Sequence, residues 1–251
     1  MELAYNGGAY HGWQTQPGDV TVQETVEDAL STLLRRKVQV VGCGRTDTGV
    51  HASQYFLHFD IDGGISSVGE MDEEGLVFKM NSILPDDIAV YRIFQVKDEA
   101  HARFNALSRS YQYRLFEGKS PFLRGLVWQK RALNLDIDRM NQAASVLLEY
   151  TDFKCFSRSK TDVKTYICKV VEAKWEFEEE LLVFHITADR FLRNMVRAIV
   201  GTLIEIGQGK LEVHDMRRII ESRDRTQAGP SVKAEGLYLS EVRYPKNLSI
   251  D

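Results

Sequence analysis

The chain has 251 residues, of which 43% are hydrophobic and 27% are charged. That balance is typical of a globular protein and excludes disorder along most of the length, and the longest apolar runs fall far short of the roughly 20 residues that cross a bilayer. The formal net charge of −4 argues against binding of nucleic acid through bulk positive charge, but it leaves room for a basic cleft on an acidic body.

The first residues have neither the basic segment nor the apolar core of a secretory signal, so we expect a cytoplasmic protein. The three cysteines are odd in number and form no CxxC pair, which suggests neither a disulfide framework nor a zinc cluster. The six histidines are scattered, and none forms an HExxH-like pair with a neighbour. We therefore expect reduced thiols and no metal.

The first half of the chain predicts both helices and strands. Apolar residues recur at helical spacing over 22–34, with Thr21 as the N-cap and Glu24 three residues later. The glycines, serines and acidic residues at 62–75 predict a mobile surface loop. The remaining elements are strands at 37–41, around Tyr55 to Phe59 and at 88–96, and a short helix at 75–83.

The second half follows a domain join that we expect near residues 103–105. Two apolar segments, 169–177 and 181–187, flank a glutamate-rich turn, which is the pattern of an antiparallel hairpin. The other elements are strands at 111–116 and 236–244, and helices at 138–150, at 191–206 and at 213–223. Hairpins with interspersed helices indicate an α+β fold with a largely antiparallel sheet.

The connection at 42–52 gathers three glycines, a cation, an anion and a histidine between two predicted strands. Glycines let the backbone approach a ligand closely, and strands hold the ends of the loop, so Asp47 can be presented rigidly to a substrate. Alternatively, Asp47 and Thr46 only make hydrogen bonds within the turn, with Arg45 as a salt-bridge partner. The chemistry of these residues alone leaves both interpretations open.

This loop does not fit the better-known glycine signatures. The chain contains neither GxGxxG nor GxxxxGK[ST], which disfavours binding of nucleotide phosphates. It also lacks a GxSxG elbow, so a serine hydrolase is poorly supported. A reaction centred on a carboxylate remains.

Residues 44–52, GRTDTGVHA, resemble the GRTDxGVHA signature of the TruA family of tRNA pseudouridine synthases, in which the aspartate is catalytic. The resemblance covers nearly the whole chain. Further matching segments are YNGGAYHGWQ at 5–14, VQE at 22–24, NSILPDDI at 81–88, HARF at 101–104, RSYQY at 109–113, NMVR at 194–197 and KAEGLYL at 233–239. Asn6 replaces the aspartate that is usual in the opening motif, and Thr48 stands where alanine is more usual, but neither change removes a catalytic group.

The resemblance implies that the protein isomerises uridine to pseudouridine, with Asp47 as the catalytic carboxylate or nucleophile. The reaction breaks the N1–C1′ bond, turns the base and rejoins it through C5 without redox change, so no cofactor is expected. A carboxylate can add covalently to the sugar or the base, or take up a proton, and the base must first leave its stack. Which atom Asp47 attacks stays open.

The resemblance also implies roles for three further residues, each with a structural alternative. Arg45 would hold the place of the flipped-out base or contact phosphate; a fold-stabilising ion pair is the alternative. Tyr111 corresponds to the tyrosine that stacks on the target base, whereas spacing alone favours a core aromatic. Arg197 corresponds to the basic residue that pairs with the catalytic aspartate, and a helix-surface arginine with a snorkelling stem is the alternative.

In full, the resemblance implies an α+β enzyme of two similar lobes, 1–103 and 104–251, with sheets that join across a central catalytic cleft holding Asp47 and Tyr111. It implies a homodimer that acts on the 3′ side of the anticodon stem-loop of tRNA, at positions 38, 39 and 40, with no membrane and no other protein partner. Two alternatives stay open. One is a pseudouridine synthase with another RNA target, and the other is an inert RNA-binding module, which would not require the carboxylate.

Overall fold

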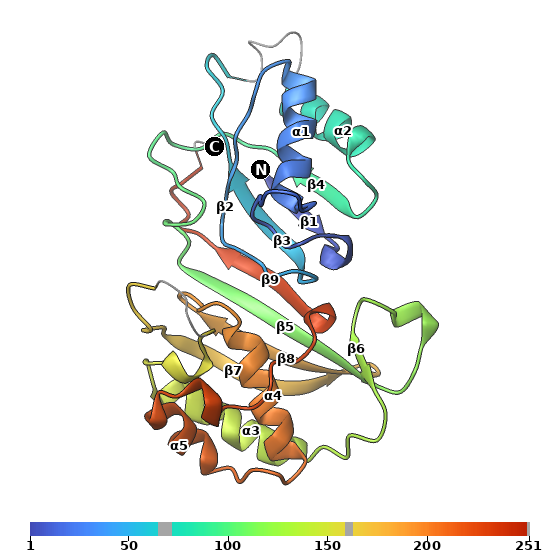
Figure 1. Ribbon diagram of the computed structural model, residues 1–251. Coiled ribbons are helices and arrows are strands. Elements are labelled where there is room, and N and C mark those ends of the chain that lie inside the picture. Colours follow the sequence, from blue (N-terminus) through green and yellow to red (C-terminus); the bar gives the residue numbers. More distant parts are fainter. Residues whose placement is uncertain (65–71, 159–162, 250–251) are drawn as a thin grey trace. The chain divides into compact units, whose positions relative to one another are not determined.

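The computed structural model describes residues 1–64, 72–158 and 163–249 (Figure 1). The chain divides into two compact units, Met1–Leu107 with Leu239–Asp251, and Ser108–Tyr238. Each combines a mainly antiparallel sheet with helices, which confirms the predicted α+β class. Within the described ranges, no helix is both long and apolar enough to span a bilayer. Half of the surface loop predicted at 62–75, residues 65–71, lies outside these ranges, and its last residues belong to a helix that begins at Glu73.

The sheet of the first unit has the strand order β4-β1-β3-β9, and β2 also pairs with β3. The pairs β1–β3, β1–β4 and β2–β3 are antiparallel. Helices α1 and α2 pack against each other, and α2 lies against β4 (Figure 1). The bounds are β1 Glu2–Tyr5, α1 Val22–Leu34, β2 Val41–Gly42, β3 His51–His58, α2 Glu73–Ile83, β4 Ile88–Arg92 and β9 Leu237–Arg243, of which the part from Leu239 onward belongs to this unit.

Strand β9 ties the last part of the chain to the first unit. The backbone N–H of Val242 donates to Oε1 of Gln54 on β3 (2.9 Å), and the backbone N–H of Leu107 donates to the carbonyl of Arg243 (2.8 Å). The hydroxyl of Tyr244 donates to the carbonyl of Ala102. The first unit is therefore built from two segments that lie far apart in the sequence.

Helix α1 matches its predicted bounds, and the side chain of Thr21 accepts from the backbone N–H of Glu24 as its N-cap. The strand predicted at 37–41 is wrong for most of its length, because only Val41–Gly42 forms β2. Before it, the backbone N–H of Val38 donates to Oγ of Ser31 (3.0 Å), and that of Val40 donates to Oε1 of Glu27 (2.9 Å). Polar side chains of α1 thus take the place of a neighbouring strand.

The sheet of the second unit has the order β5-β8-β7, with β6 beside β5 in a parallel pairing. Strands β7 and β8 form the predicted antiparallel hairpin, and helices α3, α4 and α5 gather on one side of the sheet (Figure 1). The bounds are β5 Ser108–Glu117, β6 Trp128–Lys130, α3 Ile137–Val146, β7 Val170–Glu178, β8 Leu181–Ala188, α4 Met195–Gly207 and α5 Asp215–Ser222.

Several predicted ends are wrong by a few residues. Helix α3 gives way to a 3-10 turn after Val146 instead of continuing to residue 150, and Leu148 in that turn is 47% exposed. Helix α4 begins at Met195 and not at Phe191, because Asn194 adopts a left-handed conformation (φ 65°) that cannot continue a helix. The short strand β6 has no signal that we recognised in the sequence.

Helix α4 makes an unusually close backbone contact with the segment at 228–232. A Cβ atom on Gly201 would lie 1.7 Å from the carbonyl oxygen of Pro230. One residue further along the helix, Oγ1 of Thr202 accepts from the backbone N–H of Gly229 (2.9 Å). Only glycine at 201 permits this contact, which fixes the segment beside the helix that carries Arg197.

We expect Gly201→Ala to destabilise the protein. The overpacking cost of about 3 kcal/mol exceeds the gain of about 1 kcal/mol that alanine brings to a helix interior, so the free energy of unfolding should fall by about 2 kcal/mol. Urea unfolding followed by circular dichroism measures this change. Gly44→Ala is the matched control, because a Cβ atom there meets no other atom within 4 Å. Equal stability of the two variants would contradict the close contact.

Candidate active site

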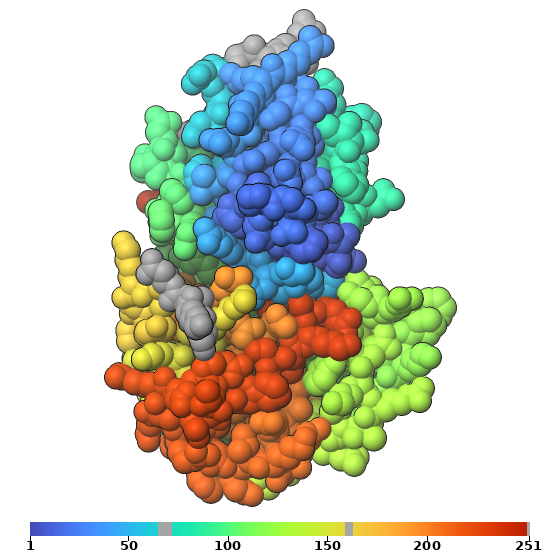
Figure 2. Space-filling model, viewed as in Figure 1, coloured from blue at the N-terminus to red at the C-terminus, as the bar shows by residue number. Residues whose placement is uncertain are grey.

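The glycine-rich loop between β2 and β3 is held by the segment at 5–14. The backbone N–H of Trp13 donates to the carbonyl of Thr46 (3.2 Å), and that of Gly49 donates to the carbonyl of Tyr10 (3.3 Å). The hydroxyl of Tyr5 shares a hydrogen bond with Oγ1 of Thr46 (2.8 Å). Figure 2 shows the dark-blue opening segment against the lighter-blue residues that follow β2. Two sequence motifs therefore form one local structure.

Two glycines of the opening segment make this contact possible. Gly12 has a φ of +91°, and a Cβ atom there would lie 2.5 Å from the carbonyl oxygen of Thr46. A Cβ atom on Gly7 would lie 2.0 Å from the carbonyl oxygen of Val50. Backbone therefore packs directly on backbone on both sides of Asp47, a fit that no residue with a side chain allows.

Aromatic rings support the loop from inside the unit. Trp13 stacks on Tyr55 with ring centroids 4.1 Å apart, and both side chains are almost completely buried. The hydroxyl of Tyr55 donates to the carbonyl of Gly44. A Cβ atom on Gly42 would collide with both rings, so this glycine is required by packing. The loop thus has a rigid base as well as fixed ends.

Asp47 is half-buried in this loop, and its carbonyl accepts from the backbone N–H of Val50 (3.1 Å), which closes the turn. Arg45 is exposed, and its Nε donates to Oε1 of Gln14 (3.2 Å). Nε2 of Gln14 in turn donates to Oε1 of Gln23 (2.7 Å). A neutral amide orients the guanidinium without cancelling its charge, which suits contact with phosphate.

A cavity of about 240 Å³ lies beside Arg45. Its walls include Trp13, Gln14 and Arg103, together with the backbone around β2. The side-chain amide of Gln14 already makes hydrogen bonds with Gln23 and Arg45. The charged residues in the wall are Arg45 and Arg103. The space borders the loop that carries Asp47 at Gly44 and Arg45.

In the second unit, the two tyrosines of the YxY motif have different surroundings. Tyr111 is half-buried on β5. Its ring is nearly perpendicular to that of Phe191, and the ring centroids lie 5.0 Å apart. Tyr113 is completely buried, and its hydroxyl donates to the carbonyl of Lys233 (2.9 Å). Burial raises the pKa of Tyr113, while the charge of Arg197 opposes that rise. Tyr113 is a core residue, whereas Tyr111 is only partly buried.

Arg197 is half-buried on α4, where its Nε donates to the carbonyl of Val232 (2.7 Å). The backbone N–H of Val232 donates back to the carbonyl of Arg197 (3.2 Å). Just before the helix, Nδ2 of Asn194 donates to Oγ of Ser231 (2.6 Å). The NMVR motif thus attaches α4 to the segment at 231–232. The carbonyl of Val232 is a partner of Arg197 that the sequence did not reveal.

The four residues predicted for the site are divided between the units. Arg45 and Asp47 share one loop of the first unit, whereas Tyr111 and Arg197 belong to the second. Within the second unit, the effect of Arg197 on the pKa of Tyr113 places its charge near β5, the strand that carries Tyr111.

The HARF motif has a local explanation that the sequence did not suggest. The backbone N–H of Ala102 donates to Nδ1 of His58 at the end of β3 (3.1 Å), and that of Arg103 donates to Nδ1 of His101 (3.1 Å). Burial, assisted by the charge of His101, lowers the pKa of His58. A neutral imidazole therefore holds the segment that brings Arg103 to the cavity.

Comparisons with known proteins agree on one family. A sequence profile described as tRNA pseudouridine synthase matches residues 143–245. The chain is 52% identical to a Porphyromonas gingivalis protein named tRNA pseudouridine synthase A, over 98% of this chain and 96% of that one. Proteins of the same name from Bacteroides thetaiotaomicron (51% identical, 98% and 90% covered) and Acetivibrio thermocellus (38% identical, 96% and 97% covered) are also similar.

The hydrogen bond to Nδ1 of His58 requires an unprotonated nitrogen, so we expect its protonation to weaken the fold. Because the pKa of His58 is lowered from 6.5, its stabilising effect is complete above that pH and is lost as the pH falls through the lowered pKa. In His58→Asn an amide oxygen replaces Nδ1 and does not titrate. Between pH 7.5 and pH 5 the melting temperature of this variant should therefore fall by a few degrees less than that of the wild type. Thermal unfolding measures this, and exposed His214→Asn should behave as the wild type.

Proposed function

Because the chain belongs to the tRNA pseudouridine synthase A family, we propose that it isomerises uridine to pseudouridine in tRNA, with Asp47 as its catalytic carboxylate. The observation that carries this proposal is the GRTDTGVHA loop, intact at 44–52 and anchored on both sides of Asp47 by backbone contacts. A protein that only binds RNA does not need a carboxylate held so firmly.

The chemistry fits a single carboxylate. The N1–C1′ bond breaks, the base turns, a C5–C1′ bond forms, and the proton that leaves C5 is balanced by one gained at N1. A carboxylate that adds covalently to the uridine divides this change into easier steps, and no electron donor or acceptor is needed. The uridine must leave its stack to reach Asp47, and unstacking costs a few kcal/mol that contacts to the RNA must supply.

We propose that Arg45 supplies one of these contacts, by holding the place of the extruded base or by binding phosphate. Its exposure, its neutral amide partner Gln14 and the cavity beside it support this role. Tyr111 is proposed to stack on the uridine, because its side chain is only partly buried and its ring contacts that of Phe191, whereas Tyr113 is completely buried in the core.

Arg197 is proposed to pair with Asp47 and to keep that carboxylate ionised and oriented. A guanidinium carries five N–H donors, and the carbonyl of Val232 accepts the one on Nε. The remaining donors suit a carboxylate, and the hydrogen bond to Val232 fixes the plane in which they lie. This role rests on the family resemblance of NMVR together with that orientation.

The substrate and assembly follow from the resemblance. We propose that the target uridines lie at positions 38, 39 and 40 on the 3′ side of the anticodon stem-loop, and that the enzyme works in the cytoplasm as a homodimer. We also propose that Asp47 of the first unit and Tyr111 of the second unit both contact the substrate.

Asp47→Asn should abolish pseudouridine formation, with a loss of at least about 10³-fold, because an amide neither adds to the uridine nor exchanges a proton as a carboxylate does. The assay is incubation with an unmodified tRNA transcript, followed by mapping of pseudouridine. Affinity for tRNA and stability should stay near those of the wild type. As a control, Asp86→Asn removes an exposed carboxylate from the segment at 81–88 and should keep full activity. Turnover by Asp47→Asn within tenfold of the wild type would remove Asp47 from the mechanism.

Binding of tRNA should weaken steeply with added salt despite the net charge of −4, because counterion release depends on local phosphate contacts. Arg45→Ala should lower turnover more than affinity if it supports the extruded base. Exposed Arg193→Ala should weaken binding and reduce the slope of log affinity against log salt by about one. Salt titrations of wild type and variants measure these effects, with exposed Arg35→Ala as the control. An affinity that does not respond to salt would show that no basic cleft exists.

A further inference from the structure

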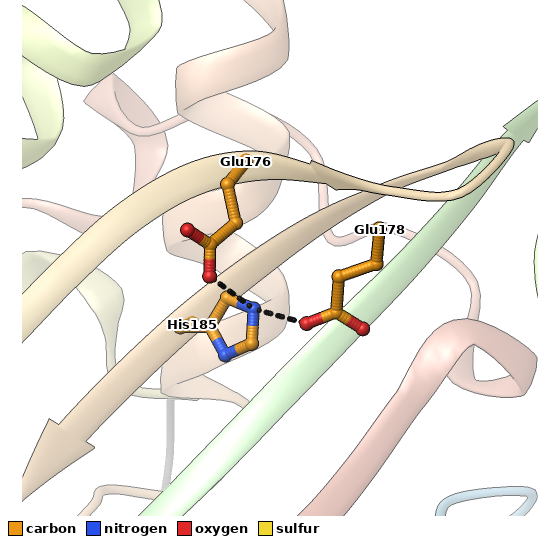
Figure 3. Close-up of side chains that lie close together, drawn as sticks. All are labelled: Glu176, Glu178 and His185. Atoms are coloured by element: carbon orange, nitrogen blue, oxygen red, sulfur yellow. Dashed lines mark ion pairs between the residues drawn. The ribbon is translucent and has the colours of Figure 1, made fainter.

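Three potential metal ligands meet on one face of the β7–β8 hairpin (Figure 3). Nε2 of His185 lies 2.9 Å from Oε1 of Glu178 and 3.3 Å from Oε1 of Glu176. One ligand atom from each residue lies within 4.8 Å of the other two. The glutamates lie two residues apart on β7, and His185 comes from β8, where it pairs with Lys174. Two strands thus bring the ligands together.

The imidazole nitrogen in this cluster is unsatisfied. Nε2 of His185 is buried, and no atom in the described parts of the chain is placed to make a hydrogen bond with it, although two carboxylates are close. Figure 3 shows the nitrogen between the two carboxylates. Oxygens that flank a nitrogen without accepting its proton are arranged like ligands around a shared ion. A buried nitrogen that makes no hydrogen bond is costly, and a metal ion between it and the two carboxylates would satisfy it.

A neighbouring cation orients one carboxylate. Nζ of Lys174 binds Oε2 of Glu176 (3.0 Å), the oxygen that does not face His185. Oε1 is thereby held toward the imidazole, in the way that outer partners orient metal ligands. The turn that follows adds Glu179 and Glu180, so four carboxylates crowd the end of the hairpin. A divalent cation would offset their mutual repulsion.

We propose that Glu176, Glu178 and His185 bind one divalent transition-metal ion of the Zn²⁺ type, with water in the fourth position. Bonds of about 2.0–2.1 Å in a tetrahedron separate the ligand atoms by roughly 3.4 Å, close to the two measured distances. The glutamate side chains are 42% and 45% exposed, so both can shift by the few tenths of an ångström required. An imidazole ligand favours Zn²⁺ over Mg²⁺ or Ca²⁺, which prefer oxygen alone.

This inference departs from the sequence analysis, which predicts no metal because no two ligands show a helical or CxxC spacing. A hairpin creates a different spacing, in which residues two apart on one strand face a residue on the other. The bound ion would clip β7 to β8 next to their turn. The proposed metal site does not depend on the proposed catalysis, because none of the three ligands belongs to the proposed active site.

The test is a titration of the metal-stripped full-length protein with Zn²⁺ by isothermal calorimetry, with Co²⁺ as a spectroscopic probe. We expect one equivalent of Zn²⁺ to bind, and Co²⁺ to give the visible absorption of a tetrahedral site. Glu178→Gln and His185→Asn should each weaken binding at least tenfold. Glu180→Gln removes the same charge from the adjoining turn but no ligand, so it should leave the affinity unchanged. Excess Mg²⁺ should not compete.

Circular dichroism would show whether His185→Asn, inside the sheet, still folds; Glu178→Gln changes only a largely exposed side chain and tests the site by itself. Equal Zn²⁺ affinities of Glu178→Gln and Glu180→Gln would overturn the proposal. So would a wild type that binds no Zn²⁺ at millimolar concentration, in which case the three residues form only an ion pair between an imidazolium and carboxylates.

Discussion

The packing of backbone on backbone around Asp47 is the constraint on which the candidate site depends. Gly7 and Gly12 let the opening segment touch the carbonyls of Val50 and Thr46, and hydrogen bonds from the same segment close the contact. A loop held in this way loses little further conformational entropy when substrate binds, so its carboxylate is preorganised. The sheet beneath serves chiefly to hold these two segments in register.

Local signals in the sequence predicted those elements whose stability is itself local. Helix α1 has its N-cap and apolar face within a few residues, and the β7–β8 hairpin has its turn between its strands. The prediction at 37–41 failed because β-branched residues there satisfy their backbone through Ser31 and Glu27 of α1 instead of a neighbouring strand. The start of α4 was misplaced because the left-handed Asn194 separates Phe191 and Leu192 from the apolar residues of the helix.

The candidate site shows the same division. Motifs pointed to Asp47, Arg45, Tyr111 and Arg197 as candidates. The motifs did not predict which groups form hydrogen bonds with them. The carbonyl of Val232 is 35 residues from Arg197 along the chain, and the imidazole of His58 is 44 residues from Ala102. No periodicity in the sequence reveals partners so far apart. Such contacts decide how a functional side chain is oriented, and they became visible only in three dimensions.

The order of the chain has a consequence for biosynthesis. The unit that carries Asp47 contains β9, which is translated only after the whole second unit. As the chain leaves the ribosome, the hydrogen bonds from Val242 to Gln54 on β3 and from Leu107 to Arg243 form only after residues 242 and 243 have been made. Residues 108–238 can fold before that. The unit made first is thus completed last, and β3, the strand that follows the Asp47 loop, gains its neighbour β9 only when almost the entire polypeptide has been synthesised.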